Sequence, residues 1–123
     1  MKSAISWFEI PTLNLPRAQA FYEAMLDCKL RPEAMGPSQG AIFPYEGEGV
    51  GGALLCGPDA PTPGHSGVLI YLDASPSLDA AVQRARAAGA EVLVDRLELP
   101  EGLGYIAHLI DLDGNCIGLH ALT

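Results

Sequence analysis

Side chains that could do chemistry gather near the C-terminus, in the stretch DLDGNCIGLH. Three oxygen-bearing side chains stand there at every second position: Asp111, Asp113 and Asn115. A calcium loop of the EF-hand type needs glycine at its sixth position and glutamate at its twelfth. Here Gly114 is fourth and Leu122 is twelfth. The stretch therefore predicts a tight turn, in which Asp and Asn side chains bond nearby backbone and glycine supplies a positive φ.

Trp7 and Glu9 form a second candidate pair, near the N-terminus. Alternation along a strand would place both side chains on one face. If that face lines a cleft, Trp7 supplies a flat apolar wall and Glu9 a charge, an acceptor or a general base. The alternative is a core tryptophan with a glutamate at the rim of the sheet.

His108 interrupts the apolar run YIAHLI, so it needs a polar partner, a ligand or solvent. Its candidate roles are proton transfer and ligand binding, and the alternative is a structural histidine. Cys116, Gly118 and His120 share a face by alternation. Gly118 could widen a pocket, and His120 fits a pocket, an exposed site or a dimer contact. Gly51 and Gly52 predict a bulge or a close approach of another group.

The elements that must position these residues occur in the same order twice. In the first half we expect strands at 3–12, 29–35, 40–46 and 50–56, with a helix at 14–27 after the first. In the second half we expect strands at 68–74, 91–95, 103–110 and 115–120, with a helix at 75–90 after the first. Asn14 and Ser75 are the expected helix caps. The apolar spacing predicts two buried helix stripes, Ala18, Phe21, Tyr22 and Met25 in one and Leu78, Ala81, Val82, Ala85 and Ala88 in the other.

The repeated order predicts an α+β fold made of two βαβββ modules. They form one domain, 1–123, with module 1 at 3–56, a Pro/Gly-rich linker at 57–67 and module 2 at 68–121. A helix covers one face of each sheet, so the other face must be covered or must line a cavity. We therefore expect a curved, mixed sheet of eight strands around a cleft.

Composition limits the function classes. The chain has 123 residues, 49% of them hydrophobic, and a net charge of −8, which argues against nucleic acid and anionic membrane surfaces as partners. No run is long enough to span a membrane, and the N-terminus lacks a signal-peptide pattern. Three widely spaced cysteines predict reduced thiols rather than disulfides. We expect a soluble, cytoplasmic protein.

Five stretches resemble the vicinal oxygen chelate superfamily, which includes glyoxalase I, bleomycin-resistance proteins and extradiol dioxygenases. IPTLNLPRAQAFYEAML resembles the opening of the family and HLIDLDGNCIGLH its closing hairpin. GVGGALLCG, VLIYLDASPSLDAAVQRARAAGAEVL and ELPEGLGYIAHLID resemble a glyoxalase-related bacterial branch. The resemblance covers nearly the whole chain and implies a glyoxalase-like fold, a small-molecule ligand and a homodimer.

Metal-using members of this superfamily take one ligand, His, Glu or Gln, from each of four strands. Those positions carry over to Trp7, to Gly52 or Ala53, to Val68 and to Gly118. None of these side chains can bind a divalent ion, so the resemblance implies no metal and no other cofactor here. A displaced site would have to use Glu9, His65 or His108.

Three functions are compatible with these observations. The first is metal-independent binding of a small organic molecule in a cleft lined by Trp7, Glu9, His108, Gly118 and His120. The second is a lyase or isomerase, related to lactoylglutathione lyase, that uses Glu9 or His108 for proton transfer. The third is a structural or partner-binding module.

Overall fold

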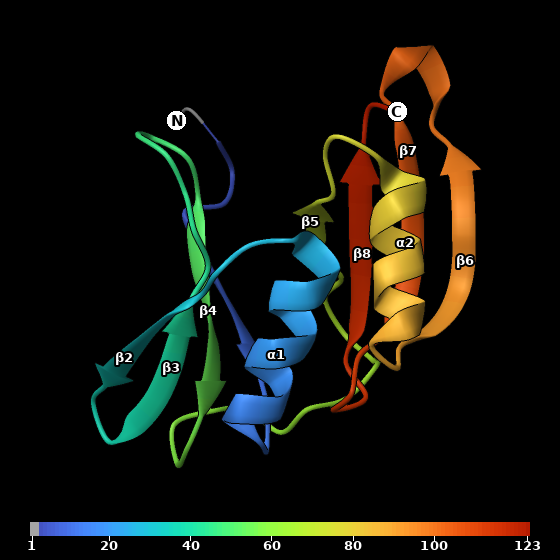
Figure 1. Cartoon of the computed structure of the whole chain (residues 1–123). Coiled ribbons are helices and arrows are strands. Elements are labelled where there is room, and N and C mark those ends of the chain that lie inside the picture. The colour runs from blue at the N-terminus through green and yellow to red at the C-terminus, as the bar shows by residue number, and fades with distance from the viewer. Residues whose placement is uncertain (1–2) are drawn as a thin grey trace.

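A computed structural model describes residues 3–123, so residues 1 and 2 of the expected domain lie outside the described residues. Two βαβββ modules follow one another along the chain (Figure 1). The first contains β1 (Trp7–Pro11), α1 (Leu15–Leu26), β2 (Arg31–Met35), β3 (Ser38–Ile42) and β4 (Gly51–Cys56). The second contains β5 (Tyr71–Asp73), α2 (Leu78–Ala87), β6 (Glu91–Glu98), the short 3₁₀ helix η1 (Pro100–Gly102), β7 (Tyr105–Ile110) and β8 (Cys116–Ala121).

Each module folds into its own four-stranded mixed sheet. The strand orders are β1-β4-β3-β2 and β5-β8-β7-β6. The first strand of each module pairs parallel with the last, and the other neighbours are antiparallel. This confirms the α+β fold of two βαβββ modules. The eight strands are divided between two sheets, because β1 and β5 are both edge strands and no ladder joins them.

Helix α1 begins as its sequence predicts. The Asn14 side chain accepts a hydrogen bond from the backbone N–H of Arg17 at 3.2 Å, which caps the first turn. The four residues of the predicted stripe are the buried ones: Ala18, Phe21, Tyr22 and Met25. These four buried side chains mark the face of α1 that packs against the first sheet.

Helix α2 begins later than predicted. Ser77, not Ser75, is the cap, and its hydroxyl accepts from the backbone N–H of Ala80 at 3.2 Å. Ser75 instead lies in the turn that leaves β5, where its backbone N–H donates to the Asp73 carboxylate at 2.9 Å. The predicted buried stripe is confirmed for Leu78, Ala81, Val82 and Ala85, whereas Ala88 is only partly buried.

The two helices pack against each other in the interior. Helix α1 also contacts β3 and β4, while α2 contacts β6, β7 and β8 (Figure 1). Each sheet therefore has a helix-covered face and a second face without a helix of the described chain, called the open face below. No helix among residues 3–123 is both long and apolar enough to cross a membrane.

Candidate functional site

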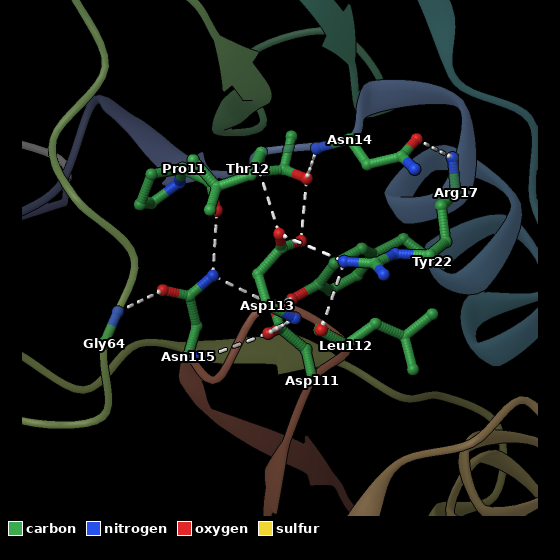
Figure 2. Close-up of polar contacts among 11 residues, drawn as sticks. Pro11, Thr12, Asn14, Arg17, Tyr22, Gly64, Asp111, Leu112, Asp113 and Asn115 are labelled. Carbon is green, nitrogen blue, oxygen red and sulfur yellow. Dashed lines mark hydrogen bonds and ion pairs between the residues drawn. The ribbon is translucent and has the colours of Figure 1, made fainter.

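The Asp111–Asn115 stretch is a turn in which both carboxylate oxygens of Asp111 accept hydrogen bonds (Figure 2). Asp111 Oδ1 accepts from the backbone N–H groups of Asp113 and Asn115, both at 2.9 Å. Asp111 Oδ2 accepts from the Tyr22 hydroxyl at 2.5 Å and from Asn115 Nδ2 at 3.0 Å. Every carboxylate oxygen of Asp111 is thus occupied by internal donors, which confirms the turn prediction.

The same turn joins the two modules (Figure 2). Asp113 accepts from the Thr12 hydroxyl at 2.7 Å and from the Leu13 N–H at 2.9 Å. Asn115 Nδ2 donates to the Pro11 carbonyl at 2.9 Å. These bonds tie the β7–β8 turn to the connection between β1 and α1. Their function is structural, because they set the position of β1 relative to the second module.

Trp7 and Glu9 share the open face of the first sheet, as predicted. Trp7 Nε1 lies 3.2 Å from Glu9 Oε2, so the indole donates to the carboxylate. The neighbouring strand β4 leaves room for two aromatic rings because Gly51 has no side chain. A Cβ on Gly51 would lie 2.8 Å from the Tyr45 ring and 3.0 Å from the Trp7 ring. The predicted glycine pair therefore marks a close approach of aromatic side chains.

On the open face of the second sheet, Tyr71 reaches across β8 to β7. Its hydroxyl lies 2.7 Å from His108 Nε2. The ring covers Gly118, where a Cβ would lie 2.4 Å from Tyr71 Cδ1. The expectation that Gly118 widens a pocket is thus corrected, because the Tyr71 ring fills that space. The polar partner that His108 needs is Tyr71.

His120 holds the loop between β6 and β7. Its Nε2 lies 2.6 Å from the Leu103 carbonyl oxygen. In the ladder, His120 is paired with Asp73 of β5. Hydrogen bonds from the Ser75 side chain and backbone lower the pKa of Asp73, and the charge of His120 adds to this effect.

The two modules place an aromatic residue, a glycine and a carboxylate in the same way. Trp7 is paired with Gly51 in the first sheet, and Tyr71 with Gly118 in the second. Glu9 follows Trp7 by two residues, as Asp73 follows Tyr71. Tyr71 and Asp73 were missed by the sequence analysis. Aligning WFE of the first strand with YLD of the fifth would have found both.

A groove runs along the seam between β1 and β5, and is called the inter-module groove below. It consists of three adjoining cavities of about 490, 270 and 150 Å³. The two larger cavities share Phe8, Val50, Leu72 and Asp73, and the largest and smallest share Val68 and Ile70. Most of the remaining lining is apolar. Glu9 lines the smallest cavity, and Tyr71 lines the largest. Of the predicted site residues only Glu9 lines the groove, while Trp7, His108, Gly118 and His120 lie on the open faces.

Comparison with known proteins places the chain in a family. The chain belongs to the Glyoxalase/Bleomycin resistance protein/Dioxygenase superfamily, whose sequence model matches residues 4–119. A search of curated proteins finds no match.

Solved structures share the fold at low identity. A glyoxalase/bleomycin resistance protein from Albidiferax ferrireducens is 20% identical, with a TM-score of 0.71 over 95% of this chain and 97% of that one. The fosfomycin resistance protein FosX from Listeria monocytogenes is 20% identical, with a TM-score of 0.70 over 100% and 94%. A glyoxalase/bleomycin resistance protein from Catenulispora acidiphila is 18% identical, with a TM-score of 0.64 over 97% and 98%. At sequence identities this low, the similarity shows a shared fold only.

The residues of this chain do not fit the four-ligand metal site of metal-using members. Trp7, Gly52, Ala53 and Gly118 offer no ligand atom. Val68 lies outside β5 and is 93% exposed. By ladder position, Tyr71 rather than Val68 corresponds to Trp7, because β5 begins three residues later than expected. Among residues 3–123, no group of three or more His, Cys, Asp or Glu side chains could hold an ion.

Proposed function

We propose that this protein binds a small organic molecule in the inter-module groove, without the metal site of its metal-using relatives. The observation that carries the proposal is the largest cavity, about 490 Å³, with a mainly apolar lining. Pockets for small ligands generally have volumes of about 300–1,000 Å³ and apolar walls with a few polar groups. Three free cysteines fit a reducing, cytoplasmic setting.

The protein is proposed to act as a homodimer. Large apolar side chains are exposed at the open faces and the seam, including Trp7 at 40%, Tyr71 at 44% and Leu97 at 53%. Contiguous exposed apolar surface is typical of protein contacts. Light scattering at micromolar concentration should give twice the mass of one chain. A monomer at that concentration would contradict this part of the proposal.

The groove can be tested with the neutral fluorophore prodan, whose emission shifts to the blue in apolar surroundings. We expect saturable binding with one site per chain. Val50→Trp should abolish it, because Val50 lines both larger cavities and the indole would fill them. Leu122→Trp is the matched control, since Leu122 is 67% exposed and lies outside the groove lining. Absence of saturable binding, or equal binding by both variants, would overturn the proposal.

A second candidate function is proton transfer, as in a lyase or isomerase. The observation that favours it is the half-buried His108 imidazole, held 2.7 Å from the Tyr71 hydroxyl. The Glu9 carboxylate is the other candidate base, oriented by Trp7. Incubation with dihydroxyacetone in D₂O should show C–H exchange by NMR that is lost in His108→Ala or Glu9→Gln. Exchange retained in both variants would contradict these roles.

A further inference from the structure

The inter-module groove has charge of one sign. Its three cavities contain two charged side chains among their lining residues, Glu9 and Asp73, and both are acidic. No lysine, arginine or histidine of the described chain lines it. The whole chain has the same sign, with a net charge of −8. A groove of one sign with low-dielectric walls concentrates ligands of the opposite charge.

Each carboxylate is also held in place. Asp73 accepts from the Ser75 N–H at 2.9 Å, and Glu9 accepts from Trp7 Nε1 at 3.2 Å. The nearest basic group in the ladder is His120, paired with Asp73 but bonded to the Leu103 carbonyl oxygen. Asp73 is therefore a fixed acceptor at the edge of the groove.

Aromatic rings line the groove beside Asp73. Tyr71 and Asp73 share one strand face by alternation, and both line the largest cavity of the groove. Phe8 lines the two larger cavities beside Asp73. A ring face attracts a cation, and the attraction grows when water is excluded. The combination of carboxylate, ring and apolar wall suits one ligand class.

We infer that the ligand of this groove is an apolar organic cation, such as a hydrophobic primary amine or a quaternary ammonium compound. The inference rests on the proposed binding function and names the chemistry of its ligand. The apolar body occupies the cavity beside Phe8, Val50 and Leu72, and the positive group lies against Asp73, with Glu9 at the other end of the groove. An anion of the same shape is repelled, and a neutral analogue lacks the charged contact.

Three naphthalene compounds of one shape separate these cases: 1-naphthylmethylamine, 1-naphthylmethanol and 1-naphthoate. By calorimetry at pH 7 and low salt, the amine should bind about ten-fold tighter than the alcohol, as a charge-assisted hydrogen bond predicts. The naphthoate should not bind. Added salt should weaken binding of the amine and leave binding of the alcohol unchanged.

Asp73→Asn tests the residue, and it keeps an oxygen to accept the Ser75 N–H. This substitution should weaken binding of the amine about five- to twenty-fold, in line with loss of a charged partner. Binding of the alcohol should not change. Glu9→Gln should also weaken binding of the amine. Glu91→Gln removes the same charge from the far edge strand β6 and is the control, which should bind all three compounds like the parent.

The outcomes separate the two proposals. If the alcohol binds as tightly as the amine and Val50→Trp blocks both, the groove binds ligands but the cation inference is wrong. The same holds if neither Asp73→Asn nor Glu9→Gln weakens the amine. If none of the three compounds binds the parent protein, the proposed binding function itself is contradicted.

Discussion

The Tyr71 hydroxyl lies 2.7 Å from His108 Nε2, which links the edge strand β5 to β7 across the intervening β8. The two residues are 37 positions apart. Contact is possible because Gly118 of β8 has no side chain, so the Tyr71 ring can lie flat over it. One hydrogen bond thus depends on the identity of a third residue.

Tyr71→Phe should release the His108 ring without unfolding the protein. The lost hydrogen bond is exposed to solvent, so the free energy of unfolding should fall by no more than about 1 kcal/mol. The ¹⁵N chemical shift of His108 Nε2 should move, because its hydroxyl partner is gone. The shifts of His120 should not change, since that ring bonds the Leu103 carbonyl. An unchanged His108 signal would contradict the contact.

Gly118→Ala should break the same contact from the other side. A Cβ there would lie 2.4 Å from Tyr71 Cδ1, so the ring must swing outward. We expect the His108 signal to change as in Tyr71→Phe, with a loss of about 1 kcal/mol or more from overpacking. Gly64→Ala is the control, because a Cβ at Gly64 meets nothing within 4 Å. Equal behaviour of the two alanine variants would show that the ring does not cover Gly118.

Tyr22→Phe should destabilise the joint between the modules. The buried Tyr22 hydroxyl donates to Asp111, and burial, with the charge of Asp111 adding, raises the pKa of Tyr22 well above its ordinary value. Without the hydroxyl, a buried carboxylate oxygen loses a donor, at about 1–3 kcal/mol. Urea unfolding measures this loss. Tyr45→Phe, at a residue that is 53% exposed, should change the stability by less than about 0.5 kcal/mol.

Glu23→Gln tests a carboxylate at the helix end. The Glu23 side chain accepts from the Leu30 N–H at 2.8 Å and from Gln19 Nε2 at 3.2 Å, and these bonds lower the pKa of Glu23. A lowered folded-state pKa stabilises the fold above the unfolded value of about 4.3, and the gain disappears as pH falls through the folded value.

The parent should therefore exceed Glu23→Gln in stability at pH 7, by less than about 1 kcal/mol because the carboxylate is solvent-screened. The difference should shrink toward zero in acid. Urea unfolding of both proteins between pH 7 and pH 3 measures it. A difference that is constant over this range would contradict the assignment to Glu23.

Local patterns were sufficient for the elements and their order. The spacing of Ala18, Phe21, Tyr22 and Met25 predicted the buried face of α1, and Asn14 its start. The Asp111–Asn115 turn was also predictable, because its bonds are made within five residues. The cap of α2 was not, since Ser75 and Ser77 both fit the pattern, and in the structure Ser75 lies in the turn after β5 while Ser77 caps the helix.

The sequence by itself determined the class of fold and the sharing of a face by Trp7 and Glu9, since both depend on residue type and short spacing. Only the tertiary structure decided where the cavities lie. It divided the eight strands into two sheets, placed Asp73 in the groove beside Phe8 and Val50, and filled the space at Gly118 with Tyr71. These relationships join residues distant in sequence, and they follow from packing and ladder register, which no local pattern encodes.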